Sequence, residues 1–384
     1  MMRVLFVDDE RFVLEATKRA MHCMRNEWEM EFLPSGAEAL ESLARAPADV
    51  IVSDVRMPGM DGWQLLAEVK KLYPQTVRLV LSGYAEPGAI MRLVTSAHQY
   101  LAKPGNSDSL KAAVAQTQLM KSLLSNESLV RLVGEVGVLP TFPGAVVEIS
   151  TCLRRPNATI GEAAQIISRD VAMTANLMKV MNSAFFGSRR QVTSVERAVA
   201  YLGFDTLTAL VLGHSLFCAH KASAMEMLWQ HSFETARAAR DIALAEQLSP
   251  IRVEEAFLAG MLHDVGRVVF ATRTAPQAQA PTPAAAVDTH HAEVGAYLLG
   301  LWGFPSHIVA ASALHHKPSA RADRSLDLTV LVHVADRLAH RERGSAPALA
   351  ESGVEPGVLE ELRIADHWPK WLEAVSRDSE AHAA

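Results

Sequence analysis

The sequence predicts an α/β domain with a parallel sheet, followed by an all-α helical bundle. Short apolar runs alternate with helical patterns over residues 1–105, an order that builds a parallel sheet with helices on both faces. Beyond residue 145 the pattern is almost wholly helical, with Gly and Pro at the breaks. Between the two regions, the run GEVGVLPTFPG at 134–144 marks a domain boundary.

The predicted strands of the first domain end in polar residues. Apolar runs occupy residues 3–9, 49–55, 77–83 and 99–104, and a helical pattern follows the first from Arg11 to about Asn26. In an open α/β sheet, ligands bind at the carboxyl ends of the strands. We therefore expect a site at this edge. Its polar residues are Asp8, Asp9, Asp54, Ser82 and Lys103.

The rest of the chain is expected to be helical. Residues 107–133 hold neither Pro nor Gly, which predicts that the last helix of the first domain (1–122) runs on as a connector into a helical domain at 134–340. No pair of strands is expected in that domain. The Ala/Pro/Gln-rich residues 271–288 are expected to form a surface loop. The extension at 341–384 is expected to be partly helical with a frayed end.

Composition restricts the class of partner. Of the 384 residues, 49% are hydrophobic and 21% charged, which is ordinary for a globular protein with a buried core. The net charge of −6 disfavours nucleic acid as a partner. A DNA-binding regulator is the third class of function considered, since VTSVERAVAYLGFDTLTALVL has a helix–turn–helix pattern, but it lacks a basic recognition helix.

Location follows from what the sequence lacks. No apolar run reaches the roughly 18 residues of a spanning helix, and no signal peptide opens the chain, so we expect a cytoplasmic protein with no membrane partner. The three cysteines, Cys23, Cys152 and Cys218, are odd in number and far apart, which indicates neither a disulfide framework nor a zinc knuckle.

The acids at the predicted sheet edge need a cation. Two carboxylates about 4 Å apart repel by roughly 4 kcal/mol at an effective dielectric constant of 20. Taken singly, Asp8 or Asp9 could cap a strand end and Lys103 could be a surface charge. Together with Asp54 they predict a Mg²⁺ site with a nearby ammonium group, which suits phosphoryl transfer to an aspartate. Pro104 follows the lysine, and the sequence leaves its peptide isomer open.

These motifs resemble the receiver domain of bacterial two-component response regulators, over residues 1 to about 122. The resembling stretches are VDDE, SDVRMPGMDGWQLL, LSGY and YLAKP. The resemblance implies a flavodoxin-like, five-stranded parallel sheet and a sensor histidine kinase or phosphotransfer protein as partner. It implies Asp54 as phosphoacceptor, with Asp9, Asp54 and the backbone carbonyl of Arg56 as Mg²⁺ ligands and Asp8 as their support. It also implies a switch set of Ser82, Tyr100 and Lys103.

Histidines and aspartates recur along the helical region. Helix packing can gather them in the interior of a bundle, where they would suit Fe, Mn, Zn or Ni. The alternative for His263–Asp264 is a hydrogen bond between two helices, and His315–His316 also fits a helix end. His290, His307, His333 and His340 are expected to be surface or core histidines. The predicted metal set is His231, His263, Asp264, His291, His315, His316 and Asp336.

The helical region resembles the HDOD domain, the HD-related output domain. The resembling stretches are VLPTFPGAVVEI, ISRDVAMTANLMKVMNSAFFG, VTSVERAVAYLGFDTLTALVLGHSLF, HHAEVGAYLLGLWGFPSHIVAASALHHKP and VHVADRLA. Many members of that family have lost the metal ligands of HD phosphohydrolases, whereas this chain keeps the ligand order of the HD-GYP phosphodiesterases. It departs from those enzymes in three ways. It has no Gly-Tyr-Pro after the His-His pair, Arg267 stands where a lysine is expected, and Met227 stands where some place a glutamate ligand.

Two functions remain open on the sequence alone. The first is a response regulator whose phosphorylated receiver controls an HDOD module that binds an output protein not named by the sequence. The alternative is a phosphorylation-gated metal phosphohydrolase, with two metals bridged by Asp264 acting on a phosphodiester such as a cyclic dinucleotide. Whether the chain is an enzyme is left open, as is a homodimer, which receivers often form.

Overall fold

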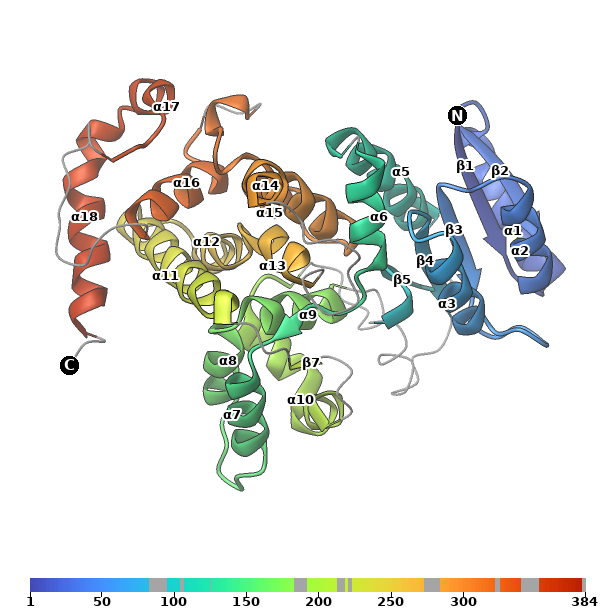
Figure 1. Cartoon of the computed structure of the whole chain (residues 1–384), viewed down its shortest axis with the longest axis horizontal. Coiled ribbons are helices and arrows are strands. Elements are labelled where there is room, and N and C mark those ends of the chain that lie inside the picture. The colour runs from blue at the N-terminus through green and yellow to red at the C-terminus, as the bar shows by residue number, and fades with distance from the viewer. Residues whose placement is uncertain are drawn as a thin grey trace.

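The computed structural model shows an α/β domain at one end of the molecule and the C-terminal helix at the other (Figure 1). The residues described are 1–82, 95–103, 107–124, 126–182, 192–212, 218–219, 223–272, 284–321, 325–339 and 352–381. Among their helices, none combines the length and the hydropathy needed to cross a membrane. Pro104 and His340 lie outside the described residues.

The α/β domain contains the predicted five-stranded parallel sheet. Its strands are β1 (Met2–Val7), β2 (Trp28–Leu33), β3 (Val50–Asp54), β4 (Val77–Ser82) and β5 (Gln99–Ala102), in the order β2-β1-β3-β4-β5. The apolar runs of the sequence miss β2, because its middle residues are only partly buried and alternate in polarity. The central β1 and β3 are buried almost throughout, as expected for strands covered on both faces.

Alternate residues of β1 belong to two separate hydrophobic cores. Val4 and Phe6 pack with α1 (Arg11–Met21) and α5 (Ser107–Leu123), whereas Leu5 and Val7 pack with α2 (Gly36–Arg45) and α3 (Gly62–Leu72). This follows from the period of two in a strand, which sends successive side chains to opposite faces. The sheet is therefore a middle layer between two layers of helices, and the predicted site lies at the carboxyl ends of its strands.

The loop after β3 is held close to the strand it leaves. Asp61 and Gln64 form a reciprocal capping box that starts α3. A Cβ at Gly62 would lie 1.9 Å from the carbonyl oxygen of Asp54, so only glycine permits this approach. The backbone at Asp54 is therefore fixed by local structure on both sides of the loop.

The predicted single connector helix at 107–133 is wrong in its continuity. The chain forms α5, which ends at Leu123, and a separate α6 (Glu127–Glu135). The side chain of Asn126 accepts hydrogen bonds from the backbone amides of Ser128 and Leu129, which caps α6. An asparagine in the N-cap position can start a new helix without any Pro or Gly. The absence of Pro and Gly therefore did not exclude a break between α5 and α6.

The C-terminal domain is the predicted helical bundle. Its helices are α7 (Pro143–Leu153), α8 (Ile160–Ser168), α9 (Val171–Met181), α10 (Val195–Leu212), α11 (Ser223–Ala245), α12 (Pro250–Leu262), α13 (Val265–Ala271), α14 (Ala284–Leu301), α15 (Ser306–Leu314), α16 (Leu328–Ala339), α17 (Pro356–Glu361) and α18 (Ile364–Ala381). Every residue of α9 is buried, so this helix is the centre of the first half of the bundle.

Three local expectations for this domain are corrected. Two short segments, β6 (Pro140–Thr141) and β7 (Cys218–Ala219), pair in parallel although no strand pair was expected. The loop predicted at 271–288 is shorter, because α14 starts at Ala284, and residues 273–283 lie outside the described part. The predicted frayed end is helical through Ala381, since α18 packs on α11 by burying Trp371.

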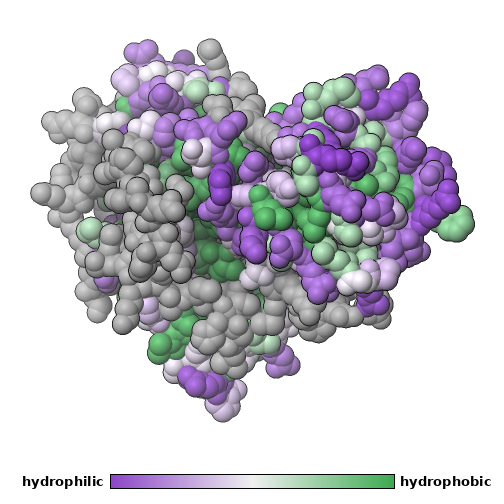
Figure 2. Space-filling model, turned by 45° about the vertical axis from the view of Figure 1, so that its right-hand side comes forward, coloured by the Kyte–Doolittle hydropathy of each residue, from purple (hydrophilic) through white to green (hydrophobic). Residues whose placement is uncertain are grey.

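The two domains meet through amide groups of the receiver-like domain and the end of α14. Gln99 Nε2 donates to the carbonyl of Leu301 at 3.0 Å, and Gln116 Nε2 donates to that of Gly300 at 3.2 Å. Buried Arg78 also donates to the carbonyl of Gly134 at 2.7 Å. Figure 2 shows hydrophobic residues in the hollow beside the α/β domain, whereas hydrophilic residues are gathered along the outer rim of that domain. The start of β5 and helix α5 are thus joined by hydrogen bonds to the end of α14.

Candidate functional site

The structure brings the acids at the carboxyl edge of the sheet together around one lysine. Lys103 Nζ lies 2.5 Å from Asp8 Oδ2 and 2.7 Å from Asp54 Oδ1. Ligand atoms of Asp8, Asp9 and Asp54 lie within 4.8 Å of one another. The parallel pairing of β1 with β3 creates this cluster, because both strands end at the same edge.

Charge at this edge is only partly balanced. Burial would lower the pKa of Lys103, but hydrogen bonds to Asp54 and Asp8 raise it overall, so the ammonium stays charged. The backbone amide of Arg56 donates to Asp54 Oδ2 at 3.1 Å. One ammonium facing three carboxylates leaves room for a divalent cation, and a cluster of carboxylate oxygens is the donor set that Mg²⁺ prefers.

The other two residues of the predicted switch set belong to the strands β4 and β5. Ser82 is the last residue of β4, and Tyr100 in β5 is buried. β3, β4 and β5 are neighbours in the sheet, so Asp54, Ser82 and Lys103 follow three adjacent strands. The order of strands therefore places the backbone of Asp54, Ser82 and Lys103 along one edge of the sheet.

A second cluster lies inside the helical bundle and unites all seven predicted metal-binding side chains. They come from α11, the end of α12, α14, the end of α15 and α16. Asp336 Oδ1 lies 3.1 Å from His231 Nε2 and 3.6 Å from His263 Nε2. Asp264 Oδ1 lies 3.1 Å from His291 Nε2 and 3.6 Å from His315 Nε2. Two carboxylates are thus surrounded by imidazoles.

Asp264 lies between two groups of ligands. Its Oδ2 is 3.7 Å from His263 Nε2, whereas its Oδ1 faces His291 and His315. One compact group is His231, His263 and Asp264, and the other is His291, His315 and His316. One oxygen of Asp264 therefore faces each group, the arrangement needed for a carboxylate shared by two metals.

The backbone orients three of these imidazoles in the same way. Nδ1 contacts a carbonyl oxygen in the preceding turn, at 2.7 Å for His263, 3.0 Å for His291 and 2.8 Å for His315. Because a carbonyl only accepts, each Nδ1 must carry the proton. Each Nε2 then points toward the carboxylates, as in metal sites where the second nitrogen donates to the backbone.

The pKa values reflect the crowding. Burial alone would lower the pKa of His263, but Asp264 and Asp336 raise it to about 9. Burial, with His263 and His316 nearby, lowers the pKa of His315 well below its ordinary range. Burial and His291 lower the pKa of His316 to about 4. His315 and His316 are therefore neutral at pH 7, the form in which imidazole binds metal.

Some polar atoms of this cluster lack hydrogen-bond partners and are suited to bind a metal. Within the described residues, His263 Nε2 and His315 Nε2 are buried without a hydrogen-bond partner. Such atoms cost free energy unless they are compensated. Neutral imidazoles and carboxylates together are suitable ligands for Fe, Mn, Zn or Ni, so the donor set accommodates the group that the sequence predicted.

Arg267 makes a contact that sequence reasoning missed. Its Nε donates to Asp264 Oδ2 at 2.9 Å, and the guanidinium is partly exposed. The spacing of three residues along a helix was the signal available for this pair. Arg267 therefore binds the Asp264 carboxylate while its guanidinium stays partly exposed to solvent.

A close contact between α13 and α14 supports His291. A Cβ at Gly266 would lie 1.9 Å from the His291 carbonyl oxygen. We expect Gly266→Ala to lower the free energy of unfolding by about 1–3 kcal/mol, because α14 must move away. Gly161→Ala is the matched control, since nothing lies within 4 Å of that Cβ, and it should be neutral or stabilising by up to about 1 kcal/mol. Urea denaturation measures both, and equal midpoints for the two variants would contradict the expectation.

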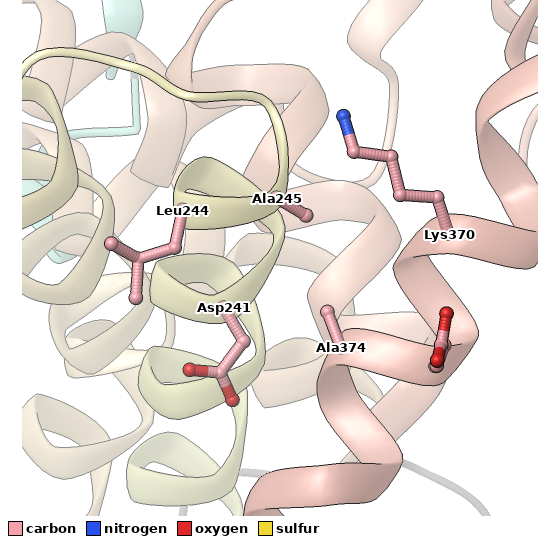
Figure 3. Close-up of a pocket in the computed structure, with 6 residues that line it drawn as sticks. Asp241, Leu244, Ala245, Lys370 and Ala374 are labelled. Atoms are coloured by element: carbon pink, nitrogen blue, oxygen red, sulfur yellow. The ribbon is translucent and has the colours of Figure 1, made fainter.

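A surface crevice of about 370 Å³ lies away from both clusters, between α11 and α18 (Figure 3). In the close-up, Asp241 and Leu244 come from α11 and Lys370 and Ala374 from α18. No histidine lines it. Its position indicates a groove left by the docking of the C-terminal helix.

Comparison with protein families identifies both domains. A family model for the response regulator receiver domain matches residues 4–115, and a model for the HDOD domain matches residues 139–318. The chain contains a receiver domain followed by an HDOD domain. The predicted family and fold class are thereby confirmed, while the roles of individual site residues remain predictions.

Individual relatives resemble parts of this chain. An uncharacterized protein of Treponema pallidum is 27% identical over 46% of this chain and 37% of its own length. The hydrogenase transcriptional regulatory protein HoxA of Cupriavidus necator is 38% identical over 29% and 23%, respectively. The chain thus spans well under half the length of these two relatives. The MmoQ response regulator of Methylococcus capsulatus is 26% identical over 59% of this chain and 92% of that structure, with a TM-score of 0.44.

Proposed function

We propose that Asp54 is the phosphoacceptor of this response regulator and that a sensor histidine kinase or phosphotransfer protein supplies the phosphoryl group. The contact of Lys103 with both Asp8 and Asp54 supports this most directly. An ionised oxygen of Asp54 attacks the phosphorus, and the bond from phosphorus to the donor breaks. Lys103 attracts the phosphoryl oxygens as charge develops. Mg²⁺, held by Asp9, Asp54 and the carbonyl of Arg56 with Asp8 in support, would screen the same charge.

The acyl phosphate would act on the output domain through β5 and α5. It adds about −1.5 to −2 charges at Asp54. Ser82 donates a hydrogen bond to it, and Lys103 turns from Asp8 toward the phosphate. Gln99 lies next to Tyr100 in β5 and binds the end of α14, which also carries His291. A displacement of β5 is therefore passed to the bundle interior.

For the output domain we propose a metal-dependent phosphohydrolase that acts on a phosphodiester such as a cyclic dinucleotide. The observation in its favour is the convergence of imidazole Nε2 atoms on Asp264 and Asp336. His231, His263, Asp264 and Asp336 would hold one ion, and His291, His315 and His316 the other, with Asp264 shared. Two such ions would supply Lewis-acid activation of a phosphoryl oxygen and of the attacking water. Arg267 would attract a non-bridging oxygen of the phosphodiester.

The alternative is an HDOD module that binds an output protein and uses metal only for structure. The pairing of Arg267 with Asp264 favours it, because that pair occupies an oxygen of the shared carboxylate. The distinguishing experiment is metal analysis of protein purified without a nickel column, followed by a hydrolysis screen over cyclic dinucleotides with and without beryllofluoride. Metal with turnover supports the hydrolase. Bound metal without turnover supports the interaction module, and a chain that binds no metal contradicts both forms of the metal site.

A further inference from the structure

His333 is a buried histidine of α16 whose two ring nitrogens are both engaged. The backbone amide of Glu355 donates to its Nε2 at 3.0 Å, and its Nδ1 lies 2.6 Å from the carbonyl oxygen of His315. An amide only donates and a carbonyl only accepts, so His333 must be neutral with its proton on Nδ1. No lone pair remains for a metal. His333 is therefore excluded as a ligand even though Asp336 lies one turn further along α16.

Glu355, one hydrogen-bond partner of His333, also binds the turn at 315–321, which contains the other partner, His315. Glu355 accepts hydrogen bonds from the backbone amide of Ser319 at 3.0 Å and from its hydroxyl at 2.5 Å. Arg321 donates to the carbonyl of Pro318 at 2.7 Å and to Glu361 at 3.1 Å. The segment 352–361, which includes α17, thus holds the turn at 315–321 through side-chain and backbone hydrogen bonds.

The held turn carries two of the proposed metal ligands. His315 is fixed at both ends, because its ring donates to the Ser312 carbonyl while its own carbonyl accepts from His333. The next residue, His316, has its Nε2 2.9 Å from His291 Nε2. A shift of the His315 carbonyl would therefore move two imidazoles relative to the third member of their group.

We propose that His333 is a positioning residue that joins the segment 352–361 to the His315–His316 turn and thereby sets the affinity of the His291, His315 and His316 group for a divalent metal. The inference rests on the metal site proposed above and adds to it a dependence on chain beyond the HDOD match, which ends at residue 318. Contacts beyond the ligands fix imidazole orientation and commonly change metal affinity 10- to 100-fold.

Two substitutions at Glu355 isolate the key hydrogen bond. Glu355 has φ −60°, an angle that proline adopts without strain, so Glu355→Pro deletes the amide hydrogen that reaches His333. Glu355→Ala removes the same carboxylate but keeps that amide. We expect Co²⁺ to bind Glu355→Pro about 10-fold or more weakly than Glu355→Ala, by calorimetric titration of the full-length, metal-stripped chain. The visible absorption of bound Co²⁺ should also change, because it reports the imidazoles around the ion.

A second pair of variants tests the same role at His333 itself and includes a check that the chain is folded. His333→Phe removes both hydrogen bonds, whereas His367→Phe alters a histidine that binds Glu246 at the other end of the C-terminal region. His333→Phe should bind Co²⁺ at least about 10-fold more weakly than His367→Phe, with circular dichroism showing that both are folded. If the wild type binds Co²⁺ and all four variants match it, His333 has no positioning role. If the wild type itself binds none, the metal site is overturned and this inference with it.

Discussion

The double substitution His263→Ala/Asp264→Ala is expected to abolish metal binding by the output domain. It removes the carboxylate that faces both ligand groups and an imidazole that faces both acids. We expect the affinity to fall by more than about 100-fold, because ligands are lost from both halves of the site. Metal bound only to the folded chain stabilises it by about 2.7 kcal/mol at one hundred times the dissociation constant. Added metal should therefore raise the melting temperature of the wild type but not of the double variant.

The neighbouring histidines of α14 provide the control. His290 pairs with Glu293 at the surface, whereas His291 points to Asp264. His290→Ala should retain the full metal content and the full rise in melting temperature, and His291→Ala should lose part of both. Elemental analysis of protein purified without nickel measures the content directly. A double variant that holds as much metal as the wild type would show that the cluster is only a structural network.

The sequence predicted both clusters because their residues follow strict rules of position. Polar side chains at strand ends meet when the strands are parallel, so Asp8, Asp54 and Lys103 had to share an edge. Burying a His-Asp pair in an apolar run requires partners, and the remaining histidines in helical stretches were the candidates. Residue type and spacing carry this information without any knowledge of the helix packing.

The parts that escaped prediction depend on contacts between distant segments. His333 looked like an ordinary core histidine, because nothing in the local pattern indicates that Glu355, more than 20 residues later, reaches its ring. The break at Asn126 depends on a side-chain cap rather than on a Pro or Gly. The contacts of Gln99 and Gln116 with α14 join residues more than 180 positions apart, and no periodicity reports them.

Those two glutamine contacts join the α/β domain to the helix that carries His291. Both amides donate to carbonyl groups at the C-terminal end of α14, where helix carbonyls lack intrahelical partners. A helix moves as a rigid element, so displacement at Gly300 and Leu301 is carried to His291 in the same helix. Packing of Gly266 against the His291 carbonyl passes any such motion on to α13. Testing this path requires a measurement that follows β5 and the end of α14 together.

Replacing Asp54 with asparagine is expected to abolish phosphorylation and the response to beryllofluoride. Asparagine keeps the shape of the side chain but lacks the ionised oxygen that attacks phosphorus, so no alkali-labile acyl phosphate should form with a small phosphodonor. In the wild type, beryllofluoride should change hydrogen exchange at β5 and at the end of α14, because Gln99 connects the two. The asparagine variant should show neither change. Phosphate incorporation and exchange mass spectrometry measure the two effects separately.

Asp108→Asn is the matched control for this last expectation. Asp108 is an exposed carboxylate near the start of α5 that pairs with Lys111 at 3.8 Å, so its loss removes one charge from the same domain without touching the sheet edge. It should accept phosphate and respond to beryllofluoride like the wild type. Exchange at the end of α14 that changes equally in wild type and Asp54→Asn would break the proposed link between the phosphoacceptor and the bundle. Phosphorylation of the asparagine variant would instead show that a residue other than Asp54 is the phosphoacceptor.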